Sequence, residues 1–218
     1  MPQPDLQAIG ALKLKATAER NRGRLDSAVQ RMTEAIELLN SWLTDPDTPT
    51  SQARQLRGEL ADAWGMKGGL LRRMPGPTKP LEALEAYKSG LAFESKDGTS
   101  TYNLMNVIAL SIKAGGASPD DPTIRAHLDA AAKALAIDTE GSRKDEWWAW
   151  ADLAQVHLLN GDLGAARKVL AKGRREAGPS PDERERSAAV LLELAEHTAG
   201  SKPAASQALR VAARELGS

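Results

Sequence analysis

Residues 147–173, WWAWADLAQVHLLNGDLGAARKVLAKG, predict two antiparallel helices joined by a short turn. Bulky, small and apolar residues recur in the first half at spacings that fall on one helix face. This stripe consists of Trp150, Leu153, Ala154 and His157. Gly161 can adopt the left-handed conformation that ends a helix. Ala166 is small, as a close helix crossing requires, so the segment predicts a tightly packed helix pair.

A helix pair of this kind has an apolar face that it cannot bury by itself, so one pair predicts neighbouring pairs. The residues resemble the tetratricopeptide motif, W-x2-L-G-x2-Y followed by A-x3-F. Gly161-Asp162 would form the turn, and Ala166 and Leu170 would lie in the second helix. The resemblance implies a protein that binds other molecules through stacked helix pairs.

The composition of the 218 residues suits one compact domain or one short solenoid. Apolar residues make up 41% and charged residues 27%, which is enough apolar content for a core. Lys plus Arg and Asp plus Glu number 29 each. This balance argues against a protein dominated by binding to nucleic-acid phosphates. The chain has no cysteine, which excludes disulfides, thiolate metal sites and cysteine nucleophiles.

The sequence predicts neither a membrane span nor a signal peptide. No uncharged run approaches the roughly 18 residues that a span needs. Residues 1–24 lack the continuous apolar segment and the cleavage site of a signal peptide. We therefore expect a cytoplasmic protein that has no membrane partner.

The residue types predict an all-α fold. β-branched residues are sparse and no alternating pattern continues for long, whereas the helix-favouring Ala, Leu, Glu, Arg and Lys dominate. We expect a right-handed superhelix of about five antiparallel helix pairs, a tetratricopeptide-like α-solenoid, as a single domain over residues 1–218. The pairs are expected at residues 5–43, 51–94, 101–137, 145–175 and 181–216.

Five alanines mark the positions that we expect to be equivalent in the second helices. They are Ala28, Ala83, Ala130, Ala166 and Ala205. Their intervals are uneven and longer than the roughly 34 residues of a strict tetratricopeptide array. Because the excess length falls in Pro- and Gly-rich joints, we expect divergent repeats with elongated loops.

Three segments in the middle of the chain resemble a more specific family. They are LADAWGMKGGLLRR (60–73), ALEAYKSGLAFES (83–95) and TYNLMNVIAL (101–110). These segments are similar to bacterial relatives of the TRAF-binding region of stress-activated MAP kinase kinase kinases. The resemblance implies a regulatory module attached to, or encoded beside, a signalling or defence effector.

Gly65-Met66-Lys67-Gly68-Gly69 is the segment closest to a phosphate-binding loop. A P-loop needs the pattern GxxxxGK[ST] after a strand, and the sequence has neither the spacing nor the strand. We favour a structural interpretation, in which the glycines let helices approach closely or end the helix before Arg72-Arg73.

Tyr102, Asn103 and Asn106 lie at the start of the third pair, and the two amides project from one helix face. Inner-helix amides in the tetratricopeptide superfamily often hydrogen-bond the backbone of a bound peptide, so the resemblance implies a binding role. The structural alternative is that they cap the helix or hold the preceding loop. Both interpretations stay open.

Trp147, Trp148 and Trp150 form an aromatic cluster. Trp150 has the packing position of the repeat, so we expect it in the core. Trp147 and Trp148 point in different directions, about 100° apart per residue. One of them is expected to face the concave groove as a binding hot spot, and the slightly preferred alternative is packing against the adjacent pair.

The histidines His127, His157 and His197 are too far apart to predict a metal site. His157 replaces the usual aromatic of its repeat, and we expect a packed core residue there. No GxSxG, HExxH or other pattern joins a nucleophile to a base. We therefore expect no enzyme activity, no metal and no cofactor.

The sequence predicts a non-enzymatic adaptor or regulator that binds a protein or peptide partner in a superhelical groove. The expected partner-binding residues are Tyr102, Asn103, Asn106, Lys113, Trp148 and Gln155. The alternative is a nucleic-acid-linked sensor that uses basic helix faces. Its candidate residues are Arg167, Lys168, Lys172, Arg174 and Arg175, which solvated helix faces also explain. A homo-oligomer is compatible with the sequence.

Overall fold

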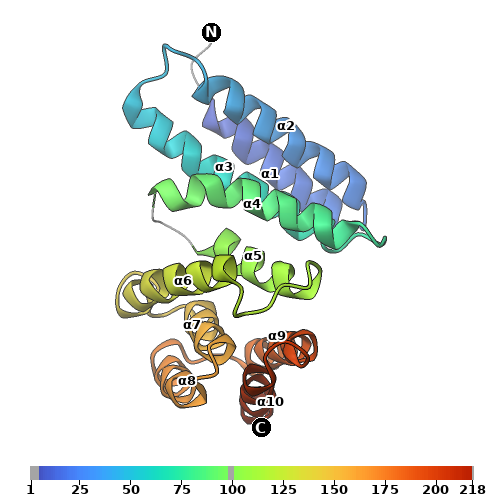
Figure 1. Ribbon diagram of the computed structural model, residues 1–218. Coiled ribbons are helices and arrows are strands. Elements are labelled where there is room, and N and C mark those ends of the chain that lie inside the picture. Colours follow the sequence, from blue (N-terminus) through green and yellow to red (C-terminus); the bar gives the residue numbers. More distant parts are fainter. Residues whose placement is uncertain (1–4, 98–100, 218) are drawn as a thin grey trace. The chain divides into compact units, whose positions relative to one another are not determined.

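The computed structural model describes residues 5–97 and 101–217, which form ten α-helices and no strand (Figure 1). This confirms the all-α prediction for the described residues. The helices are α1 (Leu6–Asn21), α2 (Leu25–Leu43), α3 (Thr50–Leu71), α4 (Lys79–Asp97), α5 (Tyr102–Lys113), α6 (Pro122–Glu140), α7 (Trp147–Leu159), α8 (Leu163–Ala177), α9 (Pro181–Thr198) and α10 (Pro203–Gly217).

The turns within the first and fourth expected pairs have the predicted glycine conformation. Gly23 and Gly161 have φ angles of 76° and 84°, in the region that L side chains rarely adopt. After Gly161, the Asp162 carboxylate accepts a hydrogen bond from the Ala165 N–H at 2.8 Å and caps α8. Gly and Asp therefore end one helix and start the next within a few residues.

The chain divides into two compact units, Met1–Val107 and Ile108–Ser218. The boundary falls within α5. The predicted superhelix and single repeat domain over residues 1–218 depend on how the two units are arranged, so both stay predictions.

In the first unit, successive helices pack against one another, α1 on α2, α2 on α3 and α3 on α4 (Figure 1). The predicted stripe of α2 is buried throughout. It consists of Ala28, Met32, Ala35, Ile36 and Leu39. Leu56 and Leu60 of α3 join the same core. This continuous apolar cluster holds the unit together.

In the second unit, α7 lies at the centre and packs against α6, α8, α9 and α10. Ala166 is fully buried in α8, as its small size predicted. A Cβ at Gly173 would lie 2.6 Å from Cβ of Trp150, so the indole occupies the space that a larger residue in α8 would fill. Close packing of α7 on α8 therefore depends on small residues opposite a large one.

The predicted register of α6 is wrong by one residue. Ala130 is exposed, and the neighbouring Ala131 is fully buried. The buried stripe of this helix consists of Ile124, Leu128, Ala131, Leu135 and Thr139, which follow a helical period. Because residues 130–132 are all alanine, the sequence at that point does not distinguish the two registers.

The glycine-rich segment lies inside α3 and does not end the helix. A Cβ at Gly68 would lie 2.9 Å from the Tyr87 ring, and one at Gly65 would lie 2.9 Å from Oδ1 of Asn103. The glycines thus make room for side chains of α4 and α5. Of the two structural interpretations of this segment, the structure confirms that the glycines let neighbouring helices approach closely.

Candidate functional site

The three clustered tryptophans of α7 have different environments. Trp150 is buried, and its indole N–H donates to the Lys144 carbonyl at 2.8 Å. Trp147 is also buried and donates to the Ser187 hydroxyl of α9 at 3.0 Å. Trp148 is 39% exposed. Trp147 therefore packs against the adjacent pair, as one alternative predicted, and Trp148 is partly exposed, so a groove-facing role for Trp148 stays a prediction.

Trp148 borders a small cavity of about 50 Å³ among α7, α8, α9 and α10, here called the Trp148 cavity. Gln155, another predicted binding residue, lines the same cavity and is itself buried. The apolar wall consists of Leu170, Val190, Leu191 and Leu216. Two predicted site residues are thus brought together beside an apolar depression large enough for a short side chain.

Asp152 places a carboxyl group in the wall of the Trp148 cavity. The residue keeps some exposed surface, but protein atoms surround its carboxyl group. This burial raises the pKa of Asp152 to about 7, against a smaller opposing attraction from Arg143. Among the described residues, Asp152 forms no hydrogen bond or ion pair. Its carboxyl group can therefore gain or lose a proton near neutral pH, a property that no sequence pattern around Asp152 indicates.

Asn103 has a structural role in the first unit. It is 2% exposed, and its side-chain amide donates to the Ala61 carbonyl of α3 at 3.0 Å. Its backbone N–H and that of Leu104 donate to the two carboxylate oxygens of Glu94, at 3.1 and 3.0 Å. Glu94 thus caps α5 from the end of α4, and Asn103 joins α5 to α3. The buried amide is out of reach of a partner in this conformation.

Tyr102 and Asn106 lie near the surface of the first unit. Tyr102 is 50% exposed, and its ring packs edge-on against Tyr87 with 5.9 Å between centroids. The Asn106 amide donates to the Tyr102 carbonyl at 2.8 Å and accepts from Arg72 at 3.2 Å. These contacts hold the Asn106 side chain against its own helix and against Arg72 after α3, and they leave the Tyr102 ring accessible.

Lys113 belongs to the second unit, where its ammonium group forms an ion pair with Glu193 of α9 at 2.5 Å. Trp148 and Gln155 lie in that unit too, whereas Tyr102, Asn103 and Asn106 belong to the first. A single groove lined by Tyr102, Asn106, Lys113, Trp148 and Gln155 stays a prediction.

A larger groove that the sequence did not indicate lies among α2, α3 and α4 of the first unit. Its volume is about 650 Å³, and it is called the Trp64 groove here. The apolar residues along it are Val29, Trp64, Leu71, Met74, Leu81 and Ala86. Leu81 is 48% exposed, so part of this apolar surface is open to solvent. The individual residues carry no pattern of a site, because the groove exists only where the three helices pack.

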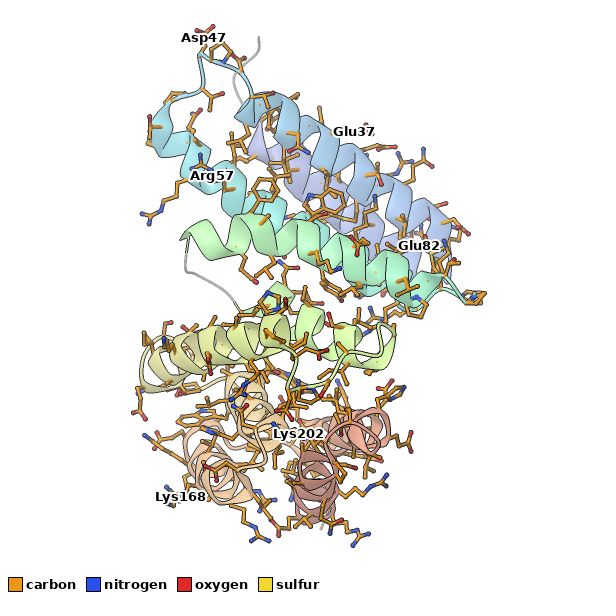
Figure 2. All side chains as sticks on the ribbon, in the orientation of Figure 1. Glu37, Asp47, Arg57, Glu82, Lys168 and Lys202 are labelled. Carbon is orange, nitrogen blue, oxygen red and sulfur yellow. The ribbon has the colours of Figure 1, made fainter. Side chains whose placement is uncertain are left out.

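The Trp64 groove has charged residues beside its apolar surface. The Lys67 ammonium group lies 5.1 Å from the centre of the Trp64 ring, a cation–π contact. Burial lowers the pKa of Lys67, although attraction by Glu37 opposes this. Lys79 pairs with Glu82, labelled near the start of α4 in Figure 2, at 2.8 Å. The groove therefore combines an apolar floor with polar edges.

The residues considered for metals and nucleic acids have ordinary structural surroundings. His157 is half-buried, which corrects the prediction of a core histidine: the position lies at the edge of the packed stripe. In the part of the chain that the structure describes, no cluster of three or more His, Asp or Glu side chains could hold a metal ion. Arg167 pairs with Glu215 and Lys172 with Glu140.

Comparisons with protein-family models, with curated protein sequences and with solved structures found no match. The tetratricopeptide resemblance, and the regulatory role implied by the resemblance to relatives of the TRAF-binding region, therefore rest on the motifs of this sequence. None of the described helices combines the length and the apolar character that crossing a bilayer requires.

Proposed function

We propose that this chain is a non-enzymatic interaction module that binds a segment of a partner protein in the Trp64 groove. The observation that carries the proposal is the groove itself, about 650 Å³ with an apolar floor and a half-exposed leucine. Surface depressions of this kind, with polar edges around apolar residues, are typical of protein-binding sites.

The occupant that fits is an amphipathic helix of the partner. Its apolar residues at helical spacing would contact Trp64, Leu71 and Leu81, as helix-in-groove complexes do. Asp26 at the start of α2 places a carboxylate at the edge of the groove. A basic side chain beside the apolar face of the partner would therefore find a carboxylate there, which favours one orientation of the helix.

The Trp148 cavity supports a second contact within the same function. A large, rigid aromatic beside a small apolar depression is the usual composition of a binding hot spot. The resemblance to bacterial relatives of the TRAF-binding region adds the expectation of a regulator, with a signalling or defence effector as its partner. The sequence supplies no pair of nucleophile and base, so binding without catalysis is the activity proposed.

The nucleic-acid alternative has less support. Arg167 and Lys172 of the basic run are paired with carboxylates, and Arg174 donates to the Glu215 carbonyl at 2.7 Å. Lys168 points away from the helices into solvent (Figure 2). Binding of labelled DNA that falls steeply with salt would favour the alternative, because it reports counterion release.

A displayed library of random peptides tests the proposal. Peptides selected on the wild-type protein, with the Leu81→Glu variant present as a soluble competitor, should share apolar residues at positions i, i+3 or i+4, and i+7. Leu81 is exposed, so this substitution should leave folding intact. A selection that yields no shared pattern, or peptides that bind the variant equally well, would contradict binding in the groove.

The predicted contribution of Trp148 and Asn106 is tested with a separate set of peptides, selected on the wild-type protein with the Trp148→Ala variant as the soluble competitor. Replacing both residues with Ala should weaken binding by about 2 kcal/mol if Trp148 is a hot spot. Ile137→Ala is the control, because Ile137 is 73% exposed and lies outside the cavity. Unchanged binding with a lower melting temperature would make the two residues structural.

A further inference from the structure

A second, smaller pocket of the first unit is lined by two arginines. Its volume is about 130 Å³, and it is called the arginine pocket here. Arg20 comes from the end of α1, Arg73 follows the end of α3, and Tyr102 is the first residue of α5. Thr17 of α1 adds a hydroxyl group. Two cations and two hydroxyl-bearing residues therefore line one pocket.

Neither arginine of the pocket is neutralised by a carboxylate of the described chain. Arg20 donates from Nε and Nη2 to the Asn21 side-chain oxygen, at 3.3 and 3.1 Å. Arg73 donates from Nη1 to the Gly69 carbonyl at 2.6 Å. A guanidinium group has five N–H donors, so each keeps donors for a ligand. By contrast, Lys13 on the same α1 pairs with both Glu59 and Asp62.

Gly69 keeps the pocket open beside these donors. A Cβ at this position would lie 3.3 Å from Nη1 of Arg73 and 3.6 Å from the Tyr102 hydroxyl oxygen. The methyl group of an alanine would thus occupy space between the guanidinium and hydroxyl groups. Helix formation alone disfavours glycine at this position, whereas glycine leaves the space beside these donors unfilled.

We propose that the arginine pocket binds a phosphoryl group. Planar guanidinium groups donate in pairs to phosphate oxygens, and two of them match a dianion better than a singly charged carboxylate. The hydroxyl groups of Thr17 and Tyr102 supply neutral donors for a third oxygen. Leu70 and Met66 line the same pocket and give an organic substituent on the phosphate an apolar surface. The pocket is distinct from the Trp64 groove, so the inference does not depend on the proposed function.

Isothermal titration of the full chain at pH 8 with inorganic phosphate, phenyl phosphate and acetate tests this assignment. Phosphate should bind saturably, and acetate at least about tenfold more weakly, because it has one charge and two oxygens. Phenyl phosphate binding more tightly than phosphate would identify a phosphate ester as the ligand. Equal or weaker binding would identify the free ion. Both outcomes support a phosphoryl site, whereas the absence of saturable phosphate binding would overturn it.

Three variants separate the pocket from general surface charge. Arg73→Gln should weaken phosphate binding at least about tenfold, as the loss of a charged hydrogen bond does. Gly69→Ala should weaken it similarly although every charge is kept. Arg57→Gln removes the same charge from α3 outside the pocket, where Figure 2 labels Arg57, and should change the affinity less than about twofold. Equal losses in Arg57→Gln and Arg73→Gln would overturn the proposal.

Discussion

Replacing Asp152 with asparagine should raise the free energy of unfolding at pH 8 and leave it nearly unchanged at pH 4. Burial raises the pKa of this carboxyl group from 3.8 to about 7 in the folded protein. Among the described residues it has no hydrogen bond or ion pair to stabilise its charge. At pH 8 the folded protein must therefore hold a poorly solvated carboxylate, which a neutral asparagine avoids.

The expected size follows from the difference in pKa between the folded and unfolded states. The folded state keeps the proton between pH 3.8 and about 7, whereas the unfolded state releases it. The contribution of Asp152 to the free energy of unfolding is therefore highest below pH 3.8, falls as the pH rises through this window, and is constant above it. One pKa unit corresponds to about 1.4 kcal/mol, so the full loss is on the order of 4 kcal/mol.

Urea unfolding of both proteins at several pH values between 4 and 9 measures this difference. The stability of Asp152→Asn minus that of the wild type should increase with pH up to about 7 and then level off. The exposed Asp129→Asn in α6 is the control for removing one negative charge. If the difference in stability between Asp152→Asn and the wild type stays constant from pH 4 to pH 9, the argument from burial is refuted.

Three further substitutions test the packing. Gly68→Ala should lower the free energy of unfolding by about 1–3 kcal/mol, because its Cβ would overlap the Tyr87 ring. In the same helix, the Cβ of Gly58→Ala would meet no neighbour, so this control should raise the free energy of unfolding by roughly 0.5–1 kcal/mol. Urea unfolding measures both. Ala166→Leu should cost about 1–3 kcal/mol at the buried crossing of α7 and α8, and an unchanged melting temperature would reject this register. Glu94→Ala should cost about 2 kcal/mol, since two N–H groups at the start of α5 lose their acceptor; hydrogen exchange at these amides as slow as in the wild type would contradict the capping role.

Helix positions were predictable because local chemistry marks them. Pro122, Pro181 and Pro203 each begin a helix, and Gly23 and Gly161 have the left-handed conformation that their turns require. These signals act between residues close in the chain, so the sequence displays them directly. The register of α6 was missed at its run of alanines, where adjacent positions are chemically identical.

The environment of Asn103 could not be read from its own helix. The space for its side chain comes from Gly65 of α3 and Gly90 of α4, where an added Cβ would lie within 2.9 and 2.7 Å of the amide. A polar residue at the start of a helix is equally compatible with a cap, a binding contact or a buried hydrogen bond. Only the packing of α3, α4 and α5 shows that Asn103 makes a buried hydrogen bond.

The Trp64 groove, the arginine pocket and the buried carboxyl of Asp152 have the same origin. Each depends on residues that are distant in sequence and adjacent only after several helices pack, and single-sequence periodicity contains no such information. Trp148 is an intermediate case. Its exposure was one of two alternatives that helical geometry left open, and the contact of Trp147 with α9 decided between them.

The affinity of one selected peptide for the wild type, Leu81→Glu and Leu14→Glu tests the central claim most directly. Both leucines are exposed, at 48% and 74%, but only Leu81 lines the Trp64 groove. In isothermal titration, Leu81→Glu should weaken binding roughly 30-fold, which corresponds to about 2 kcal/mol, and Leu14→Glu should have no effect. Equal affinities for all three proteins, with the peptide still bound, would contradict a partner site in this groove.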